Sequence, residues 1–385
     1  MASDDTLRPG GSGLPGAAST TRTRTARLPL GTGRLLQADL GAFSLEDGTT
    51  LPVTLAYRHD GPGPEAPQVL VIHALTGSAD AAGDWWEPLI GDGRALDTTK
   101  VGVLCANLLG GRYGSTGPIS VDPATGEPYG AAFPQPSARD EARALWALAD
   151  QLGIERFALV AGGSLGGMIT LEVALERPDA VDHVLPMAAP AATGPMAIAW
   201  NHIQLEVIGR LGVEGMALAR QLAMTTYRSE ADFDGRFGRA IQPDGRFAIS
   251  SYLDHQGDKL NERFDPDTYR LLVRIMDGHD VGRDRGGIVE ALRALADADA
   301  GLTGLGIQGD LLYGPVQVRS LVDHAVAAGV EATYRELESS KGHDAFLTEW
   351  PQLTVVVGEA LADGIARQAR QRRHTVAAGR SAGAA

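Results

Sequence analysis

The chain has a single cysteine among its 385 residues, which excludes an internal disulfide bond. One cysteine also cannot build a structural zinc site. Cys105 lies in the apolar run Val101–Ala106, so we expect a buried strand residue rather than a nucleophile. A reducing compartment fits this content, although an extracellular protein poor in cysteine would look the same.

Long apolar runs are also missing. No stretch approaches the roughly 18 apolar residues that a membrane span requires, and residues 1–26 lack the apolar segment of a secretory signal. Positive charge is scarce too, because 34 Lys and Arg stand against 48 Asp and Glu, a net charge of −14. This balance argues against nucleic acid or a membrane as a partner. We therefore predict a cytoplasmic protein that acts on small molecules, which need only local positive groups.

No metal-ligand cluster and no dinucleotide-binding glycine fingerprint is visible in the sequence. We therefore predict no bound metal and no resident cofactor. Hydrophobic residues make up 44% of the chain, so a sizeable core is available.

Apolar runs typical of strands alternate with helical patterns. Gln68–Ile72 and Phe157–Ala161 are examples of the former, and Ser137–Leu152 has apolar residues at helical spacing. Such alternation predicts an α/β protein with a mostly parallel central sheet and helices on both faces. Strand pattern is sparse between about residues 194 and 300. We predict that this stretch is a helical cap over the carboxyl ends of the strands, where open α/β sheets bind ligands.

We accordingly expect a disordered tail at 1–26, a core at 27–193, the cap at 194–300, the rest of the core at 301–366 and a basic tail at 367–385. The basic residues at the start of that last segment include Arg367, Arg370 and Arg372. They predict a solvated helix end, with a contact patch as the alternative.

The sequence Gly162-Gly163-Ser164-Leu165-Gly166 matches the motif G-x-S-x-G and lies between a strand run and a helical run. Such a turn holds the serine in a strained conformation and needs small neighbours. It also directs the free N–H groups of a helix N-terminus at developing negative charge. The motif predicts an α/β-hydrolase fold with Ser164 as nucleophile; the alternative is a glycine-rich turn with a passive serine.

A serine hydroxyl requires a base, and in this fold the chain order is serine, acid, histidine. His343 lies in a loop after the last strand run, whereas the other downstream histidines fall in helical runs, in the cap, before a strand or in the tail. Asp310 follows the penultimate strand run, and its task would be to hold His343 in the correct tautomer. Asp323 is the nearest rival but lies in a helical run.

An oxyanion hole needs two N–H groups. Its position predicts that one comes from Leu165, directly after the nucleophile. The other should come from the loop after the strand Gln68–Ile72, and therefore from Leu75.

Beyond these residues, a dense set of motifs resembles the homoserine O-acetyltransferases, from about residue 27 to 365. The motifs are HALTG at 73–77, DWW at 84–86, ALDT at 95–98, NLLGGRYGSTGP at 107–118, TGEPYG at 125–130, GGSLGGM at 162–168, AIAWNHIQ at 197–204, SYLDHQGDKLNERFD at 251–265, DGHDVGR at 277–283 and GHDAFL at 342–347. G-x-S-x-G alone would indicate only a hydrolase-like fold, whereas the whole set is specific to this family.

The resemblance implies transfer of an acetyl group from acetyl-CoA, or another acyl-CoA, to the side-chain hydroxyl of homoserine. The chemistry would be ping-pong through acylated Ser164, in a homodimer. By the same resemblance, Arg220 holds the carboxylate of the amino acid, Tyr227 assists and Asp344 takes the ammonium group. Arginine is a natural carboxylate clamp. The alternatives are a surface pair for Arg220 and Tyr227 and a helix N-cap for Asp344.

The sequence departs from the family in two places. Leu205–Met216 lacks the Asp-Pro, Trp and Gly-Asp-Tyr-Tyr stretch typical of members, which leaves the acceptor and the dimer open. Arg112 stands where cysteine is expected; it would either meet a succinyl carboxylate or lie on the surface. The competing functions are a serine O-acetyltransferase, a succinyltransferase, an acyltransferase of secondary metabolism, an esterase and a binding protein without activity.

Overall fold

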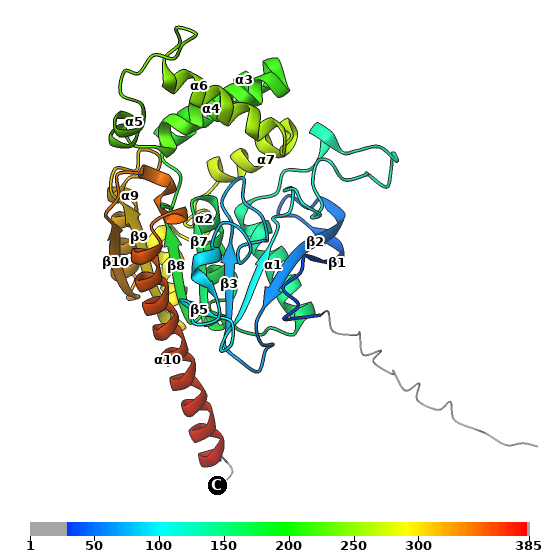
Figure 1. Cartoon of the computed structure of the whole chain (residues 1–385). Helices are drawn as coiled ribbons and strands as arrows, with labels where there is room; N and C mark the ends of the chain where they lie inside the picture. Colours follow the sequence, from blue (N-terminus) through cyan, green and yellow to red (C-terminus); the bar gives the residue numbers. More distant parts are fainter. Residues whose placement is uncertain (1–28, 383–385) are drawn as a thin grey trace, which may run out of the picture.

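A computed structural model describes residues 29–382 and has an eight-stranded sheet at its centre (Figure 1). The strand order is β1-β2-β6-β3-β7-β8-β9-β10. β2 runs antiparallel to both β1 and β6, and the remaining pairs are parallel. The strands of this sheet are β1 (Leu36–Ser44), β2 (Thr50–Asp60), β3 (Gln68–Ile72), β6 (Gly102–Ala106), β7 (Leu159–Gly163), β8 (His183–Met187), β9 (Gly301–Ile307) and β10 (Glu331–Leu337). Two short strands, β4 (Ile90–Gly91) and β5 (Leu96–Asp97), pair separately.

Helices cover both faces of the sheet, as predicted. The helices are α1 (Ala138–Leu152), α2 (Leu165–Glu176), α3 (Pro195–Leu211), α4 (Val213–Tyr227), α5 (Glu230–Phe237), α6 (Ala248–Asn261), α7 (Pro266–Asp277), α8 (Ile288–Asp297), α9 (Pro315–Ala327) and α10 (Trp350–Ala382). Side chains of α1, α2, α8 and α9 belong to one hydrophobic cluster, and those of α10 belong to a second cluster across the sheet.

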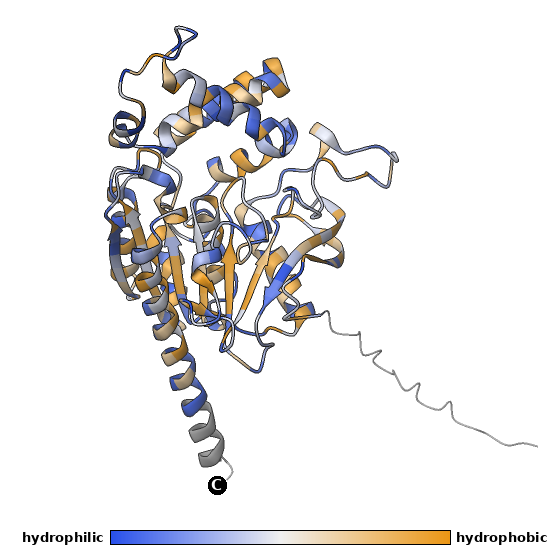
Figure 2. Ribbon diagram, in the orientation of Figure 1, coloured by the Kyte–Doolittle hydropathy of each residue, from blue (hydrophilic) through white to orange (hydrophobic). Residues whose placement is uncertain are grey.

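The central strands explain why the apolar runs were readable in the sequence. Every residue of β3, β6, β7 and β8 is buried, so these strands carry continuous apolar runs rather than an alternation (Figure 2). Cys105 lies in β6 and is buried, as expected, and burial raises the pKa of its thiol. Burial thus keeps this thiol in its neutral form, which is a poor nucleophile.

The chain between β8 and β9 is helical and runs from α3 to α8. α3, α4 and α6 lie beyond one end of the sheet, with α7 between them and the strands (Figure 1). α8 instead contacts α2 and α9 and contributes to the core cluster. We call α3 to α7 the upper helices, because they lie over the end of the sheet where Ser164 is found.

The last helix, α10, continues through residue 367, where a basic tail was expected to begin. The prediction of a solvated helix end is wrong for Arg367, which is 1% exposed. Its guanidinium donates to Asp363, Asp299 and Glu331, and these bonds allow a buried arginine. No helix within residues 29–382 is long and apolar enough to cross a bilayer. The tail expected at 1–26 lies outside the described residues.

Candidate active site

Ser164 lies at the turn between β7 and α2. Its φ of 57° and ψ of −124° are rare for a residue with a side chain. The turn is possible because glycines stand at positions 162, 163 and 166 around it. A Cβ on Gly162 would meet the carbonyl of Gly166, and a Cβ on Gly166 would meet that of Ile72 in β3. The small residues of the motif are therefore required by close packing of backbone against backbone.

His343 and Asp310 lie in contact although 33 residues separate them in the chain. His343 lies in the 3-10 helix η4 (Gly342–Leu347), and its Nδ1 is 2.7 Å from Asp310 Oδ2. The other oxygen, Oδ1, accepts from the backbone N–H groups of Leu312 at 2.8 Å and Tyr313 at 3.0 Å. These bonds fix the carboxylate, so the proton of the neutral imidazole is held on Nδ1.

The opposite nitrogen of the imidazole, Nε2, remains able to accept a proton. Nε2 of His343 is buried and has no hydrogen-bond partner within the described chain. Burial lowers the pKa of this histidine, but Asp310 and, to a smaller extent, Asp344 outweigh burial and leave the pKa above its ordinary value. The imidazole is surrounded by the aromatic rings of Tyr227, Tyr313 and Phe346. The centroid of each ring lies 5.6 Å from the centroid of the imidazole.

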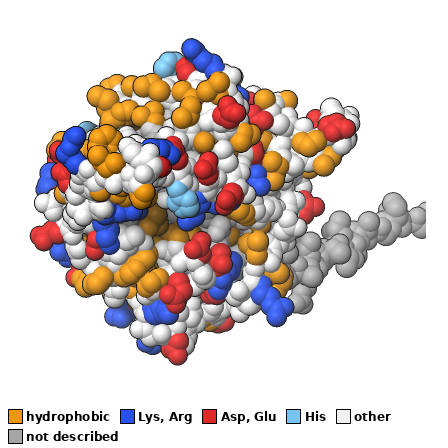
Figure 3. All heavy atoms as spheres, turned by 45° about the horizontal axis from the view of Figure 1, so that its top comes forward, with side chains coloured by type: hydrophobic (Ala, Val, Ile, Leu, Met, Phe, Trp, Pro, Cys, Tyr) orange, Lys and Arg blue, Asp and Glu red, His pale blue; other side chains and the backbone are white. Residues whose placement is uncertain are grey.

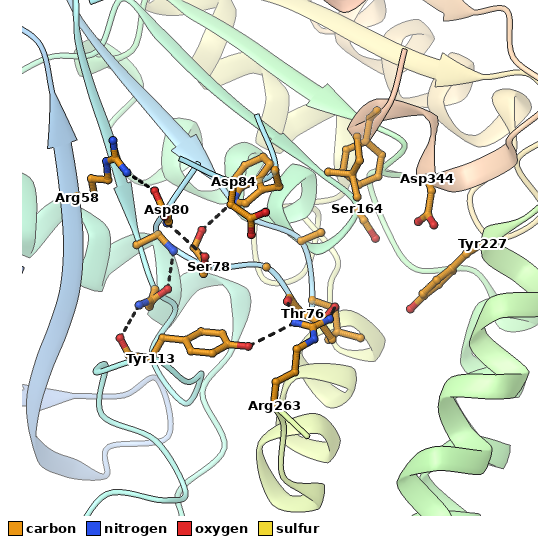
Figure 4. A pocket seen from close by; sticks show the side chains of 18 of the residues that line it. Arg58, Thr76, Ser78, Asp80, Asp84, Tyr113, Ser164, Tyr227, Arg263 and Asp344 are labelled. Carbon is orange, nitrogen blue, oxygen red and sulfur yellow. Dashed lines mark hydrogen bonds and ion pairs between the residues drawn. The ribbon is translucent and has the colours of Figure 1, made fainter. Parts of the chain in front are cut away.

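The segment Ala74–Asp80, which we call the oxyanion loop, follows β3 and faces Ser164 (Figure 4). The carbonyl of Ala74 accepts from His73 Nδ1 at 2.8 Å and from Gly77 N at 2.9 Å. In a trans peptide the N–H points opposite to the carbonyl, so this arrangement fixes the direction of the Leu75 N–H. The Leu165 N–H, at the start of α2, has no carbonyl in its own helix to bond. The two predicted donors therefore lie on the loop after β3 and at the start of α2, on either side of Ser164.

His73 was not singled out from the sequence. Burial lowers its pKa to about 4, so the ring is neutral near pH 7 and carries one proton. With that proton given to Ala74, Nε2 accepts from the Leu108 N–H at 3.3 Å. The histidine thus joins the loop after β3 to the loop after β6. The signals in the sequence were its place directly after a buried strand and its membership of the HALTG motif.

Ser164 and His343 line one cavity of about 820 Å³ between the sheet and the upper helices. Figure 3 shows the molecular surface hollowed on this face. In Figure 4, Ser164, Tyr227 and Asp344 lie on one side of the cavity, and Arg58 and Asp80 lie on the other. The positively charged residues that line the cavity are Arg58, Arg220, Lys259 and Arg263. The negatively charged ones are Asp80, Asp84 and Asp344.

The three predicted substrate-binding residues all line this cavity. The guanidinium of Arg220 lies 5.3 Å from the centroid of the Tyr227 ring, which comes about two turns later in α4. Within the described residues Arg220 has no ion pair with a carboxylate. Asp344 does have one, because Arg228 Nη2 lies 3.2 Å from its Oδ2. Asp344 lies within η4 rather than at its N-cap, which is Lys341.

Arg112 does not line the cavity. It pairs instead with Asp265, the N-cap residue of α7, at 2.9 Å. Arg112 is half-buried in this pair, so it lies neither in the cavity, where it would meet a succinyl group, nor fully on the surface. No group of three or more His, Cys, Asp or Glu suited to a metal occurs in the part of the chain that the structure describes.

Comparison with known proteins places this geometry in a family. A family model described as alpha/beta hydrolase fold matches residues 67–210. A homoserine O-acetyltransferase from Moorella thermoacetica is 41% identical over 345 residues, covering 81% of this chain and 91% of that protein.

Solved structures share the fold. The homoserine O-acetyltransferase of Bacillus anthracis aligns with a TM-score of 0.79 at 23% identity, over 85% of this chain and 97% of that one. Esterase E22 aligns with a TM-score of 0.78 at 21% identity, over 85% and 99%. The fold alone is thus common to transferases and esterases. The identity to the curated relative decides the family: this chain has an α/β-hydrolase fold and belongs to the homoserine O-acetyltransferases.

Proposed function

We propose that this protein transfers an acetyl group from acetyl-CoA to the side-chain hydroxyl of L-homoserine, which gives O-acetyl-L-homoserine and CoA. The observation that carries the proposal is the contact of His343 with Asp310 in a cavity that is also lined by the strained Ser164 and by Arg220, a cation without a carboxylate partner among residues 29–382. Acetyl-CoA is a co-substrate here, and no resident cofactor takes part.

The first half-reaction acylates the enzyme. His343 Nε2 takes the proton from Ser164 Oγ, and Oγ attacks the thioester carbonyl. The N–H groups of Leu75 and Leu165 stabilise the oxyanion of the tetrahedral intermediate. The carbon–sulfur bond then breaks, and the sulfur of CoA leaves with the proton from His343. Asp310 stays ionised throughout and stabilises the imidazolium.

The second half-reaction repeats these steps with the amino acid. His343 takes the proton of the homoserine hydroxyl, whose oxygen attacks the acyl-serine carbonyl. The same two N–H groups bind the second oxyanion. The bond from the carbonyl carbon to Ser164 Oγ breaks, and Oγ recovers its proton from His343.

Recognition of the acceptor requires a cation and an anion at a fixed separation. Arg220 would bind the carboxylate, since it has planar paired donors and no carboxylate partner in the described chain. Tyr227 keeps its ring between Arg220 and His343. The ammonium group would bind Asp344 through Oδ1, because Arg228 occupies the side of Oδ2.

We further propose that the upper helices act as a cap that closes the cavity to water, and that the protein is a homodimer. α3 and α4 expose Met196, Ile203, Leu211, Val213 and Leu218, each at least 45% exposed (Figure 3). An apolar face of this kind suits a two-fold contact with a second copy. Sedimentation should then give twice the chain mass of 40.3 kDa. The cytoplasmic location stays a prediction.

Release of free thiol tests the reaction. Purified protein is mixed with acetyl-CoA or succinyl-CoA and with homoserine, serine or water. We expect release that depends on acetyl-CoA and homoserine together and that Ser164→Ala abolishes. Release independent of an amino acid would indicate an esterase, and release with serine alone would assign another acceptor.

The clamp role of Arg220 has its own readout. Arg220→Ala should weaken acceptor binding by about 2–4 kcal/mol, which raises the KM for homoserine roughly 30- to 700-fold. Its rate with a simple ester should stay near that of the parent protein, because Ser164 and His343 are untouched. An unchanged KM for homoserine would contradict the assignment.

A further inference from the structure

Arg263 reaches from the upper helices to the oxyanion loop. It lies in the connection between α6 and α7, and its main partner, Thr76, comes 187 residues earlier in the chain. Its Nη1 donates to the Thr76 carbonyl at 2.7 Å, and its Nη2 lies 3.3 Å from Thr76 Oγ1. Figure 4 shows the side chain extended toward Thr76 and Tyr113. One arginine therefore holds both the backbone and the side chain of the residue that follows Leu75.

The other end of the loop is held by a matching set of bonds. The Ala79 N–H donates to Asn107 Oδ1 at 2.6 Å, and Asn107 Nδ2 donates to the Tyr113 carbonyl at 2.8 Å. Arg263 Nη1 lies 3.4 Å from the Tyr113 hydroxyl. Tyr113 has a φ of 61°, a conformation that a side-chain-bearing residue keeps only when its surroundings hold it. The bonds thus form a closed circuit from Thr76 through Arg263, Tyr113 and Asn107 to Ala79.

The charge of Arg263 is not neutralised by its contacts. Its hydrogen-bond partners in the described chain are Thr76 and Tyr113, and neither carries a negative charge. Other arginines that join distant segments, such as Arg112 and Arg228, end on carboxylates. A fixed cation at the wall of the cavity favours negative charge that develops there.

We propose that Arg263 is a positioning residue of the oxyanion hole. It fixes the Thr76–Gly77 peptide, whose N–H donates to the Ala74 carbonyl at 2.9 Å, and so keeps the Leu75 N–H of the Ala74–Leu75 peptide aimed at the reacting carbonyl. This inference rests on the proposed acyl transfer through Ser164. The circuit joins the hole to the upper helices, because Arg263 belongs to them and the loop belongs to the sheet. The hole is complete only while the upper helices are in place over the cavity.

The test compares Arg263→Met with Arg112→Met in the full-length protein. Arg112 is a matched control because, through Asp265, it joins the connection between α6 and α7 to the segment that holds Tyr113, and it does not touch the oxyanion loop. Rates are measured with p-nitrophenyl acetate, which needs neither CoA nor an amino acid, and with acetyl-CoA and homoserine. Loss of one oxyanion donor costs about 10²- to 10³-fold in kcat. A donor that is displaced rather than deleted should cost roughly ten- to a hundredfold.

We expect Arg263→Met to lower kcat by that factor for both substrates, to leave the KM for homoserine within about threefold, and to leave the pH midpoint unchanged, since His343 is not in contact. Arg112→Met should keep kcat within about twofold. Arg263→Lys retains the charge and one donor nitrogen and should recover part of the loss in kcat. Its kcat also tests the proposal if the Met variant does not fold.

A kcat within twofold of the parent protein, or a loss confined to the KM for homoserine, would overturn the assignment. Equal losses in Arg263→Met and Arg112→Met would also overturn it, because they would indicate loosened packing alone. The ester assay separates this inference from the proposed function. A parent protein that hydrolyses the ester but transfers nothing to homoserine would refute the proposed acetyl transfer. The ester rates of the Arg263 variants would still test the positioning role of Arg263.

Discussion

Replacement of Asp310 by asparagine is a sharp test of the triad, because the structure dictates how the amide must lie. Oδ1 accepts two backbone N–H groups, at 2.8 and 3.0 Å, and Oδ2 accepts from His343 at 2.7 Å. An asparagine has a single carbonyl oxygen for these two sides. If its NH₂ faced the backbone, two buried N–H groups would lose their acceptor, at about 1–3 kcal/mol each. The amide oxygen therefore stays with Leu312 and Tyr313, and the NH₂ faces the imidazole.

In that orientation the NH₂ donates to Nδ1 of His343, so the proton of the neutral ring moves to Nε2. The imidazole then cannot accept the proton of Ser164. We expect kcat to fall by about 10⁴, or roughly 5.4 kcal/mol in the activation free energy. The variant should fold normally, since the shape of the side chain is unchanged. Thiol release from acetyl-CoA in the presence of homoserine measures kcat, and thermal unfolding checks the fold.

Asp323→Asn is the control. Asp323 was the nearest rival in the sequence, and it lies exposed on α9. Its replacement should leave kcat within about twofold. An Asp310→Asn enzyme that keeps more than about a tenth of the parent kcat would refute the tautomer argument.

Two further predictions concern protons and stability. Because the pKa of His343 is raised above its ordinary 6.5, kcat/KM should fall with decreasing pH around a midpoint above 6.5. Asp344→Asn removes a nearby negative charge and should therefore move that midpoint to lower pH. Arg367→Ala leaves three carboxylates without their buried partner, so it should lower the free energy of unfolding by about 2–4 kcal/mol in urea titration, with kcat unchanged.

Each of these has a discriminating control. A midpoint in the Asp344→Asn enzyme equal to or above that of the parent would contradict the electrostatic coupling to His343. Arg370 lies exposed one turn further along α10, and its replacement by Ala should cost less than about 0.5 kcal/mol. Similar losses for the two arginine variants would show that burial of Arg367 contributes little.

The parts of the site that were predicted from the sequence are those that local patterns specify. The small residues around Ser164 are required by a single tight turn, and the buried strands appear as continuous apolar runs. Asp310 and His343 were found because this fold delivers an acid and a base after its last two strands in a fixed order. The contact between them, at 2.7 Å, agrees with that reasoning.

The parts that were missed depend on contacts between distant segments. Arg263 and Thr76 are 187 residues apart, and His73 and Leu108 are 35 apart, so no window of sequence displays either pair. The antiparallel strands β1 and β2 were not predicted. β1, at the edge of the sheet, is largely exposed and lacks a clear apolar run. Arg367 looked like part of a charged tail, since its three acidic partners come from two other segments of the chain as well as its own helix.

The nucleophile and its base do not by themselves decide between transfer and hydrolysis, since esterases and acetyltransferases of known structure share this fold. The acyl-serine is exposed to whichever hydroxyl reaches it first, so selectivity depends on binding the amino acid near the carbonyl while water is kept away. The groups able to do this, Arg220 and Tyr227, lie on α4, and Arg263 connects the same set of helices to the oxyanion loop. Under the two proposals, the upper helices therefore supply both the acceptor site and one support of the oxyanion hole. A variant that loosens the upper helices should lose transfer to homoserine more steeply than ester hydrolysis. Transfer requires the acceptor site and the oxyanion hole, whereas ester hydrolysis requires only the oxyanion hole.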